Sequence, residues 1–217
     1  MPPPPAGPGG AGAYSVGTAW KYGWDKTISN FGQVILAVLA LFAVQVALNL
    51  ISYAVDDDNF IVRGLFGLAS WVLSLIIGAG IVRYALDVVE GRQLRAATIF
   101  TPEKLGDVVV VSVLTGIATF IGLLLCVIPG LLVAYFTSFA LYFLMDKPEL
   151  GAIDAIKASF HFTKDNAGNV ILWFLISLAT AFVGALLCGV GLLLAIPVVL
   201  IGTAYTYKTV NNEPVAA

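Results

Sequence analysis

The segment from Ala155 to Lys208 reads AIKASFHFTKDNAGNVILWFLISLATAFVGALLCGVGLLLAIPVVLIGTAYTYK, and it decides the fold. A short charged amphipathic stretch is followed by two long apolar runs, which Gly-Val-Gly separates. Aligned with Lys157 on Arg95, the segment overlays a second copy, in which Gly168, Val170, Phe182, Gly184 and Cys188 match Gly106, Val108, Phe120, Gly122 and Cys126. Aligned with Lys157 on Lys21, it overlays a weaker third copy, in which Asn166 and Gly168 match Asn30 and Gly32. We therefore expect three parallel repeats, at about 19–90, 91–148 and 149–210.

The composition is that of a membrane protein. Of the 217 residues, 59% are apolar and 11% are charged, and the mean hydropathy is +0.96. A soluble domain carries about 25% charged residues. A hydrocarbon core of roughly 30 Å needs about 20 apolar helical residues, and Phe31–Val55 contains no charged residue. We therefore expect an all-α integral membrane protein.

The apolar runs predict six transmembrane helices in three hairpins. The expected spans are about 31–55, 60–82, 106–128, a return span to about 145, 168–188 and 190–206. A turn is expected at Pro129-Gly130, a charged connector at Arg83, Asp87, Arg92 and Arg95, and a kink at Pro197. Small residues such as Gly64, Gly67, Gly78, Gly122 and Gly184 are expected where helices pack closely.

An amphipathic stretch precedes each hairpin, at about 19–30, 94–105 and 150–166. In the first, Trp20 and Trp24 share one helical face. In the third, Ile153, Ile156 and Phe160 share one face. We expect each stretch to form a helix that lies in the cytoplasmic interface of the membrane.

Residues outside the membrane domain form tails. Residues 1–18 are rich in Pro and Gly and are expected to be a disordered tail, which serves either as a docking peptide or as a solubilising leader. A single membrane domain is expected over 19–210, and a carboxyl-terminal tail over 211–217. If the amino terminus is cytoplasmic, ten of the eleven Lys and Arg residues fall inside, and only Arg63 falls outside. The positive-inside rule therefore predicts that both termini are cytoplasmic.

No catalytic, cofactor or metal-binding signature is present in the sequence. No charged residue falls at the centre of an expected span, whereas ion-coupled transport normally needs such groups. We therefore expect a protein that is not an enzyme and needs no cofactor or metal.

Three groups of polar residues are candidate sites. Gln45 and Asn49 share a face of the first span, where they either line a polar path or bond to a neighbouring helix. The equivalent cations Lys21, Arg95 and Lys157 either hold anionic lipid headgroups or anchor the amphipathic helices. Cys126 and Cys188 occupy equivalent positions, as a candidate disulfide or as two small buried side chains.

The segment AIKASFHFT at 155–163, with Lys164, Asn166 and the late Pro197, resembles a broad group of bacterial six-span membrane proteins. These are related to the membrane domain of membrane-anchored glycerophosphodiester phosphodiesterases. The catalytic domain of those enzymes has no counterpart here, so the resemblance implies no activity. It implies a multi-pass protein of the bacterial plasma membrane.

Two functions fit these features. The first is a non-enzymatic accessory or scaffold subunit, or an assembly factor, of a membrane protein complex. The alternative is a protein that binds or translocates a lipid or small amphiphile. The expected partners are membrane lipids and another membrane protein or further copies of the chain, and nucleic acid is not expected.

Overall fold

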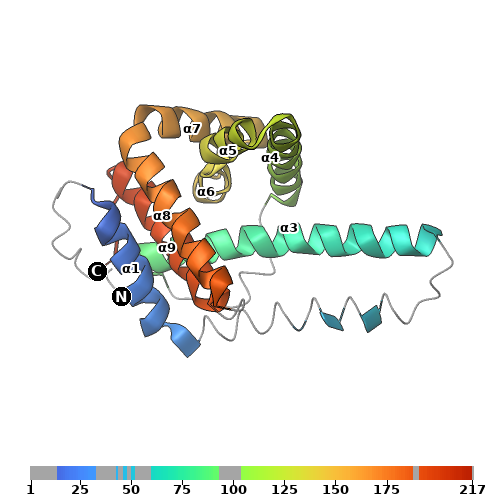
Figure 1. Cartoon of the computed structure of the whole chain (residues 1–217), viewed down its shortest axis with the longest axis horizontal. Helices are drawn as coiled ribbons and strands as arrows, with labels where there is room; N and C mark the ends of the chain where they lie inside the picture. The colour runs from blue at the N-terminus through green and yellow to red at the C-terminus, as the bar shows by residue number, and fades with distance from the viewer. Residues whose placement is uncertain are drawn as a thin grey trace.

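The computed structural model describes residues 14–32, 43, 46–47, 50–51, 60–92, 104–187 and 191–216. Apart from connections, this part of the chain is entirely helical, without a strand. Its helices are α1 (Val16–Ser29), α3 (Phe60–Glu90), α4 (Leu105–Leu125), α5 (Val127–Thr137), α6 (Ala140–Asp146), α7 (Ala152–Asp165), α8 (Ala167–Leu186) and α9 (Leu192–Val210) (Figure 1).

Five stretches of the described chain are long and apolar enough to cross a membrane. They are Gly64–Glu90, Leu105–Leu125, Val127–Asp146, Ala167–Leu186 and Leu192–Val210. These stretches match the last five expected spans, which confirms a helical, multi-pass membrane protein in its coarse form. The expected first span, 31–55, lies mostly outside the described residues.

The expected charged connector after the second span is wrong in its first half. Helix α3 does not end near Val82 but continues to Glu90. Arg83 and Asp87 lie one turn apart on it, with Arg83 Nε 3.5 Å from Asp87 Oδ1, and such pairs favour helix. The amphipathic stretch expected at 94–105 lies almost entirely outside the described residues, and α4 begins at Leu105.

The expected turn at Pro129-Gly130 is also wrong. The chain reverses before that pair, at Cys126, whose extended backbone separates α4 from α5. Pro129 and Gly130 lie in the first turn of α5. A helix tolerates proline there because the first backbone N–H groups have no partner within the helix. Gly130 packs directly against Gly122 of α4, which lets the two helices approach closely.

The fourth stretch is interrupted between α5 and α6, and α7 closes the interruption. The break at Ser138–Phe139 frees backbone groups that helix would otherwise pair. The Ser159 hydroxyl of α7 donates to the Phe136 carbonyl at 2.8 Å and accepts from the Phe139 N–H at 3.2 Å. The Phe136 carbonyl and the Phe139 N–H therefore both have hydrogen-bond partners, as backbone groups inside a membrane protein require.

Helix α7 packs through a different face from the one expected to be apolar. Its buried stripe contains Ala155, Ser159 and Phe162. Of the expected apolar face, Ile153 and Phe160 are exposed on the surface of the chain. Small residues on the buried stripe let α7 lie close to α5 and α6.

Helix α1 packs along α9 (Figure 1). It begins at Val16, inside the expected tail, because Ser15 caps it by accepting a hydrogen bond from the Thr18 N–H at 3.2 Å. The remainder of the expected tail, 1–13, lies outside the described residues. Gly23 lies on the buried stripe of α1, against the Val198 carbonyl of α9.

Two tyrosines tie this end of the chain together. The Tyr14 hydroxyl lies 3.0 Å from Thr206 Oγ1 of α9, and the Tyr22 hydroxyl donates to the Ala216 carbonyl at 2.9 Å. Burial raises the pKa of Tyr14 to about 12, so the hydroxyl stays neutral at physiological pH.

Aromatic side chains fill the interior between α6, α7 and α9. The Phe143 and Tyr207 rings lie 4.9 Å apart, edge to face, and the Phe139 and Phe162 rings lie 4.9 Å apart in the same manner. Such pairs stabilise beyond the area that they bury. The place where the return helices meet is therefore packed with side chains.

Candidate functional site

A buried lysine joins the ends of three helices at one side of the molecule. Lys208, 5% exposed and near the end of α9, places its ammonium 2.6 Å from Asp146 Oδ1, at the end of α6. It also lies 2.7 Å from Glu90 Oε1, at the end of α3, and 2.7 Å from Glu213 Oε2, just after α9. Three carboxylates thus accept the three N–H groups of one ammonium.

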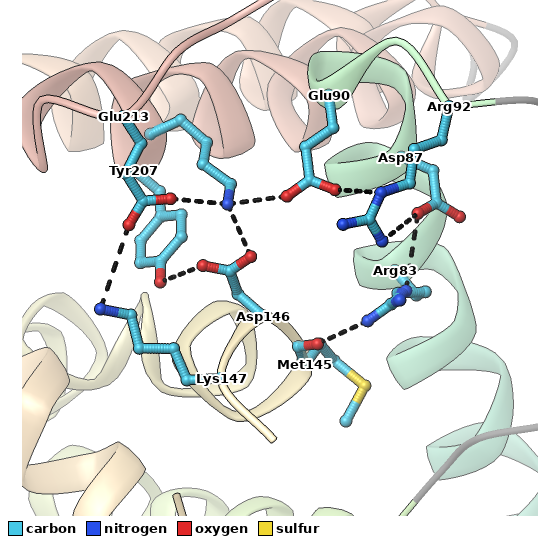
Figure 2. A network of polar contacts seen from close by, with 10 residues as sticks. Arg83, Asp87, Glu90, Arg92, Met145, Asp146, Lys147, Tyr207 and Glu213 are labelled. Atoms are coloured by element: carbon cyan, nitrogen blue, oxygen red, sulfur yellow. Dashed lines mark hydrogen bonds and ion pairs between the residues drawn. The ribbon is translucent and has the colours of Figure 1, made fainter. Parts of the chain in front are cut away.

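A second layer of charges surrounds this lysine (Figure 2). Arg92 Nε lies 2.8 Å from the second oxygen of Glu90, and Arg92 also approaches Asp87 at 3.7 Å. Arg83, paired with Asp87, donates to the Met145 carbonyl at 2.7 Å. We call the joined set the ionic cluster: Arg83, Asp87, Glu90, Arg92, Asp146, Lys147, Lys208 and Glu213.

The charges of the ionic cluster pair with one another and connect the ends of several helices. It contains as many carboxylates as cations, so its net charge is zero. The Tyr207 hydroxyl donates to the second oxygen of Asp146 at 2.8 Å and thereby connects the cluster to the aromatic interior (Figure 2). Within the described ranges, no group of His, Cys, Asp and Glu side chains could hold a metal ion. Breaking a buried pair of this kind is strongly destabilising.

A second feature is an apolar groove of about 370 Å³ between α1, α8 and α9. Stacked indoles form one wall, since the rings of Trp20 and Trp24 lie 5.6 Å apart at 12°. Trp20 Nε1 donates to Thr180 Oγ1 at 3.1 Å, and that hydroxyl donates to the Ile176 carbonyl at 2.8 Å. The Trp20 N–H and the Thr180 hydroxyl are thus already paired, and apart from the Trp24 N–H the other lining side chains are hydrocarbon.

Two mycobacterial proteins match nearly the whole chain. Uncharacterized protein Rv2560 of Mycobacterium tuberculosis is 34% identical over an alignment of 244 positions, gaps included, which covers 99% of this chain and 74% of the relative. Uncharacterized protein Mb2590 of Mycobacterium bovis matches with the same identity and coverage. The chain belongs to the Rv2560 family. No family model matches it, and no solved structure matches it. The names of these Rv2560-family members state no activity.

The expected cation sites are only partly placed in this Rv2560-family chain. Lys21 of α1 is exposed, and Lys157 of α7 is exposed and forms a 3.5 Å ion pair with Asp154. Arg95 lies outside the described residues. Two of the three expected cations are thus placed, each on the surface of its helix.

The other expected sites fall partly on undescribed residues. Gln45 and Asn49 lie outside the described part of the chain. Cys126 is a free and exposed thiol at the reversal between α4 and α5, and Cys188 is outside the described residues.

The ionic cluster was not expected from the sequence. Lys208 and Asp146 are separated along the chain by the same offset as Lys157 and Arg95, so the expected repeat would align them, with opposite charges. Glu90 ends the other return helix. Opposite charges at the ends of apolar runs that the expected repeat aligns are the sequence signal from which the cluster could have been predicted.

Proposed function

We propose that the chain is built from three parallel repeats, each an amphipathic helix followed by a hairpin of two spans, which makes six spans in all. Two docking contacts support this organisation. Gly23 of α1 lies against the Val198 carbonyl of α9. Ser159 of α7, the third-repeat counterpart of Gly23, donates to the carbonyl of Phe136, the second-repeat counterpart of Val198. An amphipathic helix thus docks on the return helix of another repeat, at equivalent positions.

Local geometry supports the same organisation. The repeat counterparts Asn30 and Asn166 end α1 and α7 with nearly the same backbone angles. Each side chain donates at 2.9 Å to the carbonyl one helical turn earlier. The counterparts Gly122 and Gly184 each pack against a glycine beyond the hairpin reversal. Helix α1 of the first repeat docks on α9 of the last repeat, and this contact favours an arrangement in which the three repeats close into a ring.

We propose that the protein acts as a non-enzymatic accessory or scaffold subunit of a complex in the bacterial plasma membrane, with both termini in the cytoplasm. The observation that carries the proposal is the ionic cluster, whose charges pair with one another and hold the helices of separate repeats together. The described helices meanwhile expose broad apolar faces. On α4 these are Ile117, Phe120, Ile121, Leu124 and Leu125. Such a molecule offers rigid surfaces for packing with other membrane proteins.

The resemblance to the membrane domain of glycerophosphodiester phosphodiesterases agrees with this proposal. We therefore propose that the chain is related to that membrane domain.

Chemical crosslinking in native membranes, followed by native mass spectrometry after extraction in a mild detergent, tests the proposal. We expect a membrane-protein partner at a fixed stoichiometry. Phe120→Ser and Leu124→Ser on the exposed face of α4 should weaken its retention. Ile153→Ser on the exposed face of α7 is the matched control. A chain that runs alone in native membranes, without a stoichiometric partner, would refute the subunit role.

A second candidate function is the binding of a lipid or small amphiphile, and the apolar groove favours it. The aromatic packing between α6, α7 and α9 lends no support to a path through the middle of the bundle. The groove instead lies at the side of the molecule, beside the exposed face of α8.

A further inference from the structure

We propose that the groove between α1, α8 and α9 is a binding site for one acyl chain of a membrane lipid. The proposal deepens the second candidate function and rests on it. It does not depend on whether the protein joins a larger complex.

The chemistry of the lining selects a hydrocarbon. The groove is lined by apolar side chains and by Thr180, whose hydroxyl already accepts from Trp20 and donates to the Ile176 carbonyl. Apart from the Trp24 N–H, the lining side chains offer no free hydrogen-bond partner, so an occupant with several polar groups would lose hydration there, which is costly. A methylene chain loses nothing and gains the burial of its own apolar surface.

The position of the groove gives a lipid direct access. Val183 and Leu187 line the groove and are also exposed on the outer face of α8. Helix α8 is one of the candidate spans, so this face meets the bilayer. The groove is continuous with that lipid-facing surface, and a chain enters from the bilayer without crossing the protein.

The indole pair fixes one side of the site. Trp24 is 39% exposed, and its ring stacks on Trp20, which the bond to Thr180 holds in place. Rigid aromatic walls bind with little loss of side-chain entropy. The pair therefore forms one rigid wall of the site.

Photo-crosslinking with a phosphatidylcholine that carries a diazirine on its acyl chain tests the site. The full-length protein is placed in vesicles of phosphatidylethanolamine and phosphatidylglycerol with a trace of this probe, and labelled peptides are mapped by mass spectrometry. We expect labels to concentrate on Trp24, Val183 and Leu187. The reference is the exposed apolar face of α4, at Phe120 and Leu125, which reports ordinary lipid contact.

A matched pair of substitutions on α8 makes the test specific. Ala179 lines the groove and is exposed, so Ala179→Phe fills the groove without a clash. Ala185 is exposed on the opposite side of α8 and does not line it. Ala179→Phe should reduce groove labelling by about tenfold, the equivalent of roughly two buried methylene groups. Ala185→Phe should leave it unchanged. Val183→Trp is a second filling variant should Ala179→Phe fail to fold.

Each result is decisive. Equal labelling of the groove and of α4 in the unmodified protein would overturn the site and leave only ordinary lipid contact. Groove labelling that persists in both filling variants would overturn it as well. A failure of the labelling test would refute the lipid site and leave the accessory-subunit proposal unaffected. Groove labelling in a protein that has no stoichiometric protein partner would refute only the accessory-subunit proposal.

Discussion

The ammonium group of Lys208 lies 2.6 Å from the carboxylate of Asp146, which precedes it by 62 residues along the chain. The two residues end α9 and α6, and Glu90 at the end of α3 completes the contact. One buried cation thus connects three return helices, and the stability of the bundle should depend on it.

Replacing Lys208 should be strongly destabilising. Lys208→Met leaves Asp146 and Glu90 without their shared cation, and we expect the free energy of unfolding to fall by about 3–5 kcal/mol. Denaturant titration in detergent micelles, followed by circular dichroism, measures the change. Lys157→Met is the control, because its ion pair with Asp154 is solvent-exposed and such pairs contribute little. Equal effects of the two substitutions would show that the cluster does not stabilise the fold.

The Tyr207 hydroxyl should contribute separately from its ring. Tyr207→Phe keeps the aromatic contacts and removes the 2.8 Å hydrogen bond to Asp146, which should cost about 1–3 kcal/mol. Tyr84→Phe is the matched control, since the Tyr84 hydroxyl is buried without a hydrogen-bond partner among the described residues. Tyr84→Phe should be neutral or stabilising. The same unfolding measurement applies, and a reversed order would contradict the assigned bond.

Gly23 should be the residue that allows α1 to pack closely against α9. A Cβ atom at Gly23 would overlap the Val198 carbonyl, so Gly23→Ala should destabilise the protein by about 1–3 kcal/mol and expose α1 to protease. Gly17→Ala, on the same helix, would place a Cβ only in ordinary contact with Ser15 Oγ at 3.8 Å, so it should stabilise α1 by about 0.5–1 kcal/mol. Limited proteolysis and thermal unfolding together measure both effects. Equal protease resistance of the two variants would argue against close packing of α1 on α9 at Gly23.

The two equivalent hairpin glycines should respond alike. Gly122→Ala places a Cβ against the backbone of Gly130, and Gly184→Ala places one against Gly191, so each should cost about 1–3 kcal/mol. Gly116→Ala, with nothing nearby, should cost nothing. Thermal unfolding of the three variants measures this, and a large difference between Gly122→Ala and Gly184→Ala would count against the repeat proposal.

Cysteine labelling should reveal the orientation. With cytoplasmic termini, the reversal at Cys126 faces outward, so a membrane-impermeant maleimide should label Cys126 in intact cells of a Cys188→Ala strain. Ser15→Cys, in a background without the native cysteines, should react only after the cells are permeabilised. The opposite pattern would invert the proposed topology.

Hydrophobic length predicted the five long apolar stretches of the described chain, because such stretches depend on composition alone. The turn at Pro129 was misplaced because a Pro-Gly pair is compatible both with a turn and with the first turn of a helix. The sequence does not separate the two, whereas the extended backbone of Cys126 does. Likewise, Arg83 and Asp87 suggested a connector, but as a pair one turn apart they stabilise the continuation of α3.

Packing residues were harder to predict than spans. Gly122 and Gly184 pack closely as expected, but Gly64, Gly67 and Gly78 have no neighbour within 4 Å in the described structure. Glycine alone does not say which face of a helix meets another. The ionic cluster depends on three helices converging, and only the equivalent positions of Lys208 and Asp146 hinted at it.

The order of the cluster residues along the chain has a consequence for biogenesis. Glu90 and Asp146 leave the ribosome well before Lys208, because the cation belongs to the last helix. Until that helix has been inserted, the earlier helices carry acidic ends without their shared counter-ion. A chain whose synthesis stops before Lys208 therefore lacks the cation that Glu90 and Asp146 share, and the ends of α3 and α6 keep only their remaining contacts.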